Sequence, residues 1–169
     1  MSTKNYYDKK AQEKLKDMAE GARVCFMCTK LSQSPLSARP MSLQEVDDDG
    51  ILWFISGKDS DKNYHLQKDA ETQLFFLDKG NSEYLSIFGK ADIYTDRATI
   101  EDKWSKMAEA WFEEGKDDPN VSIIGVRPQE VHYWENKSGG IAGFAMMAFD
   151  AVTGSDLAKK DSEHGELNV

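Results

Sequence analysis

Residues 36–66 read LSARPMSLQEVDDDGILWFISGKDSDKNYHL, and the fold is best argued from this stretch. Two runs with strand-like composition, residues 36–46 and 51–56, flank the acidic turn DDDG, which is the pattern of a β-hairpin. A short polar loop follows, and either Asp59 or Ser60 is placed to cap a helix that runs to the end of the stretch. The stretch therefore predicts a strand, a tight turn, a second strand and a helix, in that order.

Cationic and hydroxyl side chains gather where the second strand ends. Arg39 lies in the first strand, while Lys58, Ser60 and Lys62 lead from the second strand into the helix. An arginine beside a helix N-terminus that carries hydroxyls and lysines suits an anionic phosphate. Pro40 lacks a backbone donor, so the strand ladder is broken or at an edge there, where a ligand can approach.

The same residues allow a purely structural interpretation, which the sequence leaves open. In it, Arg39 pairs on the surface with Glu45, Asp47 or Glu71, and Ser60 is an ordinary helix cap beside solvated lysines. The end of the second strand also allows both a ligand-binding and a structural interpretation. Alternation sends Trp53 and Ile55 to one face of the strand and Phe54 and Ser56 to the other, and at least one of the two aromatic rings is expected in the core.

The rest of the chain predicts an α+β fold with a mainly antiparallel sheet. Helical periodicity is seen at residues 5–20 and 97–114, the second with Trp104 and Trp111 on one stripe that suits the core or a dimer contact. Further strands are expected at residues 22–30, 71–77, 83–94 and 121–134. Residues 143–152 fit either a last strand or a short helix. We expect one domain over residues 1–154 and a charged, flexible tail over residues 155–169.

Composition narrows the class of protein. The 169 residues carry a formal net charge of −9, which argues against nucleic acid or an anionic membrane surface as the main partner. No apolar run approaches the length of a membrane span, and the first sixteen residues lack the apolar core of a signal peptide. A cytoplasmic location is the expectation.

Cysteine and histidine do not form a recognisable site. Cys25 and Cys28 have C-x-x-C spacing, but in a strand residues three apart point to opposite faces, so we expect two reduced, half-buried thiols. His65, His132 and His164 are too widely separated to suggest a metal pair or a catalytic triad. No metal site is predicted.

The chain resembles the pyridoxamine 5′-phosphate oxidase-like flavin-binding split barrels, and among them the short general stress protein branch. The resemblance covers residues 8–154 and rests on ARPM at residues 38–41, LWFIS at residues 52–56 and the S-x-K-x-x-x-L helix start at residues 60–66. It implies a six-stranded split β-barrel with flanking helices. It also implies FMN, with FAD as the alternative, bound at the interface of a homodimer.

The resemblance assigns ten residues to the cofactor site, with Trp134 reaching the site from the partner subunit. They are Arg39, Pro40, Met41, Phe54, Ile55, Ser56, Ser60, Lys62, Ser86 and Trp134. One position departs from the family pattern. Asp61 stands where the oxidases often carry a second basic residue, which weakens the phosphate cage by one charge unless Lys58 compensates.

The expected function is that of a stress-related flavoprotein, with flavin-dependent oxidoreductase activity on an unknown substrate. Vitamin B6 oxidation is not expected, because the Arg-x-His pair that the true oxidases carry near their C-terminus is missing from EHGELNV. Two alternatives stay open. One is a non-catalytic flavin-binding or storage protein, and the other is a split barrel that holds haem or a deazaflavin, with His65 or His132 as the candidate haem ligand.

Overall fold

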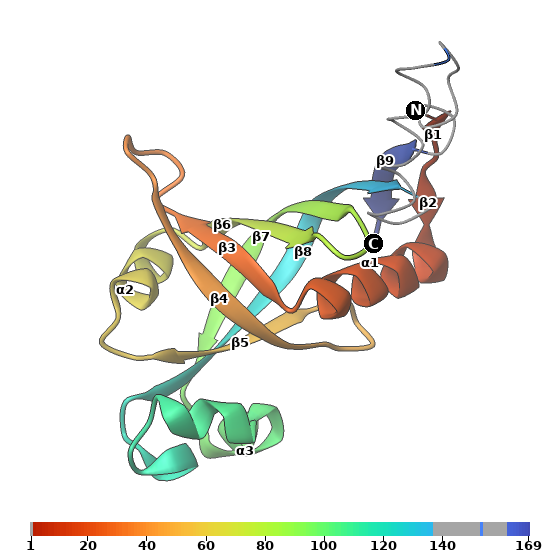
Figure 1. The fold of residues 1–169 in the computed structure, drawn as a ribbon. Helices are drawn as coiled ribbons and strands as arrows, with labels where there is room; N and C mark the ends of the chain where they lie inside the picture. Colours follow the sequence, from red (N-terminus) through yellow and green to blue (C-terminus); the bar gives the residue numbers. More distant parts are fainter. Residues whose placement is uncertain (1, 137–152, 154–161) are drawn as a thin grey trace.

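Six antiparallel strands close into a barrel at the centre of the molecule (Figure 1). The computed structural model describes residues 2–136, 153 and 162–169. In chain order the barrel strands are β3 (Val24–Thr29), β4 (Ser37–Val46), β5 (Leu52–Gly57), β6 (Glu71–Asp78), β7 (Glu83–Tyr94) and β8 (Val121–Asn136). Around the barrel the order is β8, β5, β4, β3, β6 and β7, and β7 pairs again with β8 to close the ring. The predicted α+β fold with a six-stranded antiparallel barrel is confirmed.

The β4–β5 hairpin forms where the sequence predicts it, because the turn residues satisfy one another. The Asp47 carboxylate accepts hydrogen bonds from the backbone N–H groups of Asp49 and Ile51 at 3.0 and 2.8 Å. Gly50 has a φ of +78°, a conformation that glycine adopts without steric penalty. The hairpin places Arg39 and the end of β5 on neighbouring strands.

Three helices and two short 3₁₀ turns flank the described part of the barrel (Figure 1). They are α1 (Asp8–Ala22), α2 (Asp61–Lys68), α3 (Arg97–Lys103), η1 (Lys106–Ala110) and η2 (Gly115–Asp117). Helix α1 buries Ala11, Leu15 and Met18 against the barrel, as their spacing predicts. Tyr7 precedes this helix and is exposed rather than part of its apolar side. Within the described residues, no helix has the length and apolar character needed to cross a membrane.

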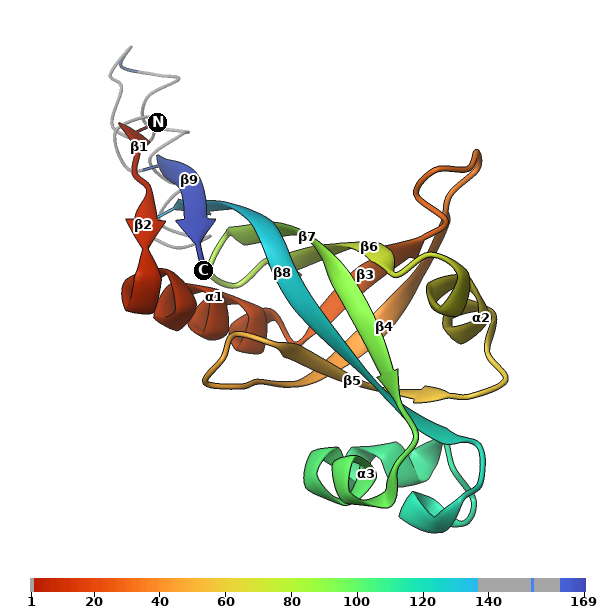
Figure 2. The ribbon, with the colours of Figure 1, turned by 180° about the vertical axis from the view of Figure 1, so that it is seen from behind.

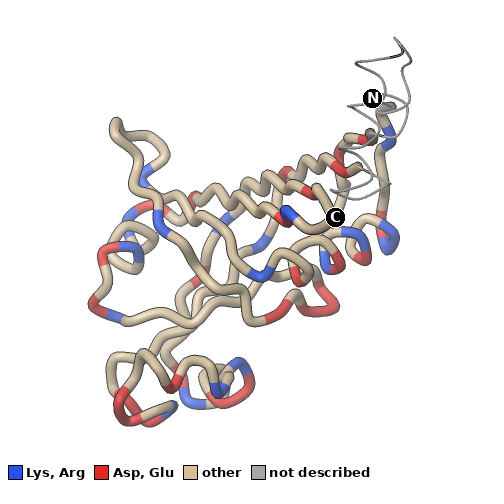
Figure 3. Tube along the Cα trace, in the orientation of Figure 1, with Lys and Arg blue, Asp and Glu red and all other residues tan. Residues whose placement is uncertain are grey.

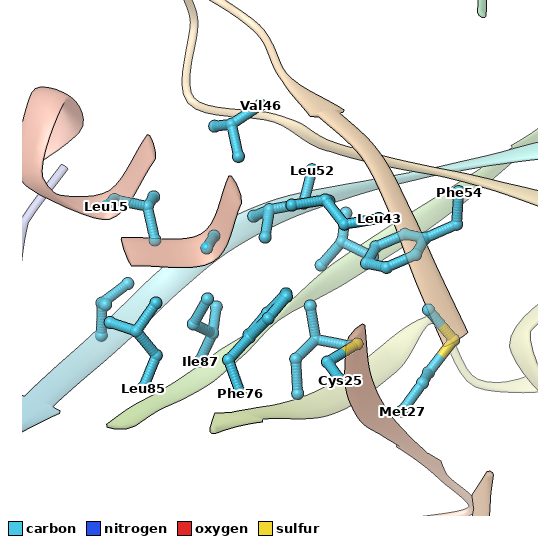
Figure 4. Packing of buried hydrophobic residues seen from close by; sticks show 14 of the residues in the cluster. Leu15, Cys25, Met27, Leu43, Val46, Leu52, Phe54, Phe76, Leu85 and Ile87 are labelled. Atoms are coloured by element: carbon cyan, nitrogen blue, oxygen red, sulfur yellow. The ribbon is translucent and has the colours of Figure 1, made fainter. Parts of the chain in front are cut away.

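The main core fills the inside of the barrel (Figure 4). Leu15 of α1 packs there with inward-facing residues of the strands, among them Met27, Leu43, Phe54 and Ile87. A second apolar cluster lies on the other side of β5 and holds the β7–β8 connection against the sheet. It contains Trp53, Ile100, Ala108, Phe112, Val121 and Ile123. Trp53 and Phe54 therefore lie in different clusters, which confirms the predicted alternation along β5.

The helix predicted for residues 97–114 is wrong beyond its first half. Helix α3 ends at Lys103, because Trp104 has the extended backbone angles φ −68° and ψ 134°. The chain then folds back through η1, so that Trp104 packs on Phe112 with ring centroids 6.0 Å apart. The same apolar spacing is thus satisfied by a compact turn, which leaves Trp111 84% exposed.

The flexible tail predicted for residues 155–169 is also wrong over residues 162–168. These residues form β9 (Ser162–Asn168), which pairs with β8 and lies beside β1 (Ser2–Thr3) and β2 (Tyr6–Tyr7), as Figure 2 shows. Glu163 is buried and accepts hydrogen bonds from the hydroxyls of Tyr133 and Tyr6. This charged segment is ordered by contacts with residues that are distant in the sequence. Its charge pattern alone therefore did not reveal them. Residues 143–152 lie outside the described residues.

Gly165 provides a test of this docking. A Cβ at Gly165 would lie 2.0 Å from the backbone oxygen of Lys4, so β9 and the N-terminal segment would have to separate. We expect Gly165→Ala to lower the free energy of unfolding by about 1–3 kcal/mol, measured by urea denaturation. Gly21→Ala is the control, because its nearest contact would be an ordinary 3.7 Å. Equal stability of the two variants would show that β9 is not docked in this way.

Candidate functional site

Arg39 is held in place by uncharged partners. It lies on β4 on the same side of the strand as the buried Met41. Its guanidinium donates hydrogen bonds to the backbone oxygen of Met27 at 3.1 Å, to Thr29 Oγ1 at 2.9 Å and to Ser37 Oγ. These bonds orient the guanidinium, and in the part of the chain that the structure describes its positive charge has no direct ion-pair partner, although the Asp61 charge acts on it. A charge held in this way is prepared for an anionic ligand.

The structural alternative for Arg39 is not realised in the part of the chain that the structure describes. Glu45 forms a salt bridge with Lys103 instead. Asp47 accepts a hydrogen bond from Trp53 Nε1 at 2.8 Å. Among the described residues, no carboxylate forms a salt bridge with Arg39.

Lys62, in the first turn of α2, lies close enough to Arg39 for the two charges to repel each other. Burial lowers the pKa of Lys62, and the positive charge of Arg39 lowers it further, while Asp59 and Asp61 act in the opposite direction. Burial also lowers the pKa of Arg39. Within the described ranges Lys62 has no salt bridge either. Two half-buried, neighbouring cations are unfavourable in the free protein, and an anion beside them relieves that cost.

A cleft of about 390 Å³ opens beside Lys62. Its floor comes from β4 and from the end of β5, and its other side comes from the β7–β8 connection. The lining residues are Pro40, Met41, Ser42, Gln44, Ile55, Ser56, Gly57, Lys62, Met107, Ala108, Trp111, Phe112 and Asn120. The volume lies within the range of small-molecule sites, and the lining combines apolar side chains with a few polar groups.

The start of α2 is anchored by a buried hydrogen-bond network around Asn63. The Asn63 amide accepts a hydrogen bond from Ser56 Oγ at 2.8 Å and donates one to Ser122 Oγ at 2.7 Å. Ser60 is the N-cap, since its hydroxyl accepts from the backbone N–H of Asn63. This network ties α2 to β5 and β8, and it thereby sets where Lys62 lies relative to Arg39.

The structure divides the ten predicted cofactor residues into three groups. Pro40, Met41, Ile55, Ser56 and Lys62 line the cleft, and Arg39 and Ser60 adjoin Lys62. Phe54 is fully buried in the main core. Ser86 and Trp134 lie on the outer face of the sheet and not in the cleft of the same chain.

The prediction missed one wall of the cleft. Met107, Trp111 and Phe112 come from a segment that was assigned to a regular amphipathic helix, and Asn120 comes from the loop before β8. Met107 and Trp111 are among the most exposed apolar side chains of the described residues. Exposure of this kind depends on the chain folding back after Trp104, so the apolar spacing alone does not reveal it.

Ser86 and Trp134 belong to a continuous, partly exposed outer face of β3, β6, β7 and β8. Strand pairing joins Phe26 to Phe75, Phe75 to Ser86, Leu77 to Tyr84 and Tyr84 to Trp134. Val24 lies further along β3, and the exposed fractions of the six apolar residues are 38–56%. Pro40 pairs with Phe26, so this outer sheet face runs to the edge of the cleft. Contiguous exposed apolar faces are typical of interaction surfaces.

The cysteines and histidines stay outside the cleft. Both thiols are free, as predicted, but they are fully buried rather than half-buried. Burial raises the pKa of Cys25 to about 12, so this thiol is inert. His65 is hydrogen-bonded to Thr29 and His132 to Glu130. No described group of His, Cys, Asp and Glu side chains is arranged to hold a metal ion.

The net charge of −9 does not contradict a cationic site. Acidic residues are spread along the trace with basic residues between them (Figure 3). Dissolved salt screens exposed charges over about 10 Å at 0.1 M ionic strength, so the charges close to a cleft decide what it attracts. The local arrangement here is Arg39 with Lys62.

A closed antiparallel barrel with a cationic cleft beside β4 and α2 is the architecture of a split-barrel protein. The sequence matches the pyridoxamine 5′-phosphate oxidase-like family over residues 10–158, and the chain belongs to that family. It is 28% identical to the protein bli-3 of Neurospora crassa over 128 residues, 70% of this chain and 61% of the relative. It is 43% identical to general stress protein 26 of Bacillus subtilis over 49 residues, 28% of this chain and 34% of the relative. The chain thus matches only part of the length of these curated relatives.

Solved structures show the same fold over more of the chain. A structure described as general stress protein 26 from Jannaschia sp. CCS1 superposes with a TM-score of 0.73 at 25% identity, covering 95% of this chain and 98% of the other. The general stress FMN/FAD binding protein of Xanthomonas citri gives a TM-score of 0.65 at 27% identity, covering 76% and 90% of the two chains. The predicted family, general stress branch included, is consistent with these relatives.

The Asn63 network can be tested by itself. Asn63→Ala removes the amide that joins α2 to both strands, so Ser56 and Ser122 lose a buried partner. We expect the free energy of unfolding to fall by about 1–3 kcal/mol in urea denaturation. Gln67→Ala, at an exposed position of the same helix, is expected to stay within about 0.5 kcal/mol of the parent. If Asn63→Ala were as stable as this control, the network would not anchor the helix.

Proposed function

We propose that this protein binds a flavin through its phosphate, with FMN as the minimal ligand. The observation that carries the proposal is the pair formed by Arg39 and Lys62, two half-buried cations that form no salt bridge among the described residues and are only partly offset by Asp61 nearby. A phosphate dianion beside them supplies the missing counter-charge. The start of α2 adds backbone N–H groups and the positive end of the helix dipole.

The cleft next to this pair suits the flat ring of a flavin. Met41, Ile55 and Phe112 provide apolar surface, and Asn120 and Ser42 add polar groups at the rim. The solved FMN/FAD binding protein of Xanthomonas citri, which shares the fold at 27% identity, supports a flavin as the ligand. When bound, the flavin supplies hydride or electron transfer, and this chain supplies the position and the electrostatic surroundings.

We favour an oxidoreductase over the two alternatives that the sequence left open. A haem in the cleft would need an axial ligand, and neither His65 nor His132, the two candidates, lines the cleft. Against a storage protein, the lining side chains of Met107 and Trp111 are exposed, so they offer a second molecule a surface beside the ligand. Anaerobic addition of NADH or NADPH to the flavin-loaded protein separates a reductase from a carrier, because only the reductase bleaches the flavin.

We further propose a homodimer formed through the outer sheet face. In a two-fold dimer the same face of each subunit meets its copy. Because this face runs from Pro40 at the edge of the cleft to Ser86 and Trp134, the partner subunit can bring these last two residues to the ligand. This arrangement accounts for predicted site residues that lie far from the cleft of their own chain.

The phosphate site is tested by titrating FMN into the protein and following flavin fluorescence. Arg39→Ala should weaken FMN binding by roughly 1.5–3 kcal/mol, the range for a hydrogen bond to a charged group, or about tenfold to a hundredfold in Kd. Lys62→Ala should cause a smaller loss that shrinks further as salt is added. Arg97→Ala, an exposed arginine paired with Glu101 and Asp117, serves as the control. If Arg39→Ala bound FMN as tightly as the parent, Arg39 would not contact the phosphate, and the phosphate site would have to lie elsewhere.

The dimer is tested by sedimentation velocity on a charged variant of the outer sheet face. Phe26→Glu combined with Phe75→Glu places four like charges in the proposed interface, two from each subunit, and we expect a monomer. We expect this monomer to bind FMN more weakly, since it lacks the partner's side chains. Tyr7→Glu is the control, because Tyr7 is 61% exposed and lies outside this face. A parent protein that sediments as a monomer would rule out the interface.

A further inference from the structure

Met107 and Trp111 stand out on the wall that the β7–β8 connection contributes to the cleft. Their side chains are 71% and 84% exposed, the two largest fractions among the large apolar residues that the structure describes, and both line the cleft. A side chain that lines a cleft and is still mostly exposed lies at its mouth. The flavin site proposed above draws on the floor of the cleft and on the buried Phe112, and it gives these two side chains no role.

The segment that presents these two side chains is attached to the barrel. Ala108 and Phe112 are buried in the second apolar cluster. The Ser105 hydroxyl donates a hydrogen bond to the side-chain oxygen of Gln44 on β4 at 2.6 Å. The backbone N–H of Trp111 donates to the backbone oxygen of Ala108 at 2.9 Å. The two exposed side chains are therefore carried by a backbone that is held in place, so they form a defined surface.

The chemistry of this surface suits a flat aromatic molecule. The indole of Trp111 has a wide face on which a ring can stack, and its N–H can donate to an oxygen at the edge of that ring. The thioether of Met107 is flexible and makes favourable contacts with aromatic rings. Because a methionine adapts to rings of different outline, the surface suits a class of flat molecules rather than one compound.

The charges around this surface disfavour an anion. Residues 104–114 contain one lysine, Lys106, and three glutamates, Glu109, Glu113 and Glu114, and all four are exposed. Lys103 precedes them and forms salt bridges with two acids. The half-buried cations of the site lie at its other end, beside α2, where the proposed function assigns them to the flavin phosphate. A second molecule with its own negative charge would face like charges at the mouth.

We propose that Trp111 and Met107 bind the electron acceptor of the flavin, and that this acceptor is an uncharged, flat aromatic compound of the quinone class. This inference rests on the flavin site proposed above and extends it, because it names the substrate class. The quinone takes up two electrons and two protons, the equivalents that a reduced flavin carries, and leaves as the hydroquinone while the flavin is oxidised. A substrate anchored by a phosphate would instead meet the surplus of negative charge on this wall.

The surface is tested by isothermal titration calorimetry of the FMN-loaded, full-length protein with menadione, an uncharged quinone. Trp111→Ala should raise the Kd for menadione about tenfold, because a stacking contact is lost, and should leave the Kd for FMN within about twofold. Trp111→Phe keeps an aromatic ring and should retain most of the affinity. Tyr64→Ala is the control, because Tyr64 is also an exposed aromatic residue and does not line the cleft.

The charge argument is tested with naphthoquinone sulfonate, which has the same two fused rings and one negative charge. At low salt we expect it to bind at least about fivefold more weakly than menadione. Glu109→Gln combined with Glu113→Gln should reduce this difference and leave the Kd for menadione unchanged. Anaerobic mixing of menadione with the photoreduced, FMN-loaded protein should oxidise the flavin and yield the hydroquinone in equal amount.

The possible failures are distinguishable. If FMN does not bind, the proposed function itself is wrong. If FMN binds but menadione does not, or if menadione binds equally well to Trp111→Ala, the acceptor surface is wrong and the flavin site stands. A loss of FMN affinity in Trp111→Ala as large as the loss for menadione would place the indole against the flavin instead. Tighter binding of the sulfonate, or a flavin that stays reduced, would exclude an uncharged quinone as the acceptor. Because Trp111 is exposed, its variants are expected to fold.

Discussion

The pairing of β7 with β8 closes the barrel, and the rest of the molecule depends on that closure. β8 pairs with β5 at its start, with β7 along most of its length and with β9 at its end. The register shifts between Phe88 and Gly89, and a Cβ at Gly89 would lie 2.4 Å from the backbone oxygen of Arg127. Glycine is required there because the two backbones approach so closely. The closed ring keeps β4, β5 and the start of α2 in one arrangement, and so keeps Arg39 beside Lys62.

Two features destabilise the protein when it has no ligand and no partner subunit. Both are features on which the proposed function depends. One is the repulsion between Arg39 and Lys62, each with a pKa lowered by burial. The other is the apolar outer sheet face that includes Phe26 and Phe75. A fold selected for stability alone would pair the cations and cover the rings. Violations of local rules tend to mark functional sites, and under the proposed function a bound anion relieves the first and a second subunit covers the second.

The parts of the fold that were predicted correctly depend on short-range patterns. The β4–β5 hairpin follows from an Asp-rich turn with glycine at the position of positive φ, and Ser60 caps α2 because its hydroxyl reaches an N–H three residues away. Alternation along β5 was enough to separate Trp53 from Phe54. The prediction of a helix after Lys103 failed because apolar residues spaced by three or four also suit a chain that folds back to pack in a second apolar cluster. Periodicity indicates which residues are buried, but it does not determine the backbone conformation through which they become buried.

The sequence alone determined the order of the barrel strands along the chain, the hairpin, and the presence of cations around the start of α2. These depend on residues that are close in the chain, and their geometry follows from local backbone preferences. The tertiary structure alone revealed that Arg39 has uncharged partners, that Trp111 lines the cleft and that Glu163 is buried between Tyr6 and Tyr133. Such contacts join residues from distant parts of the chain, and they form only when the barrel closes.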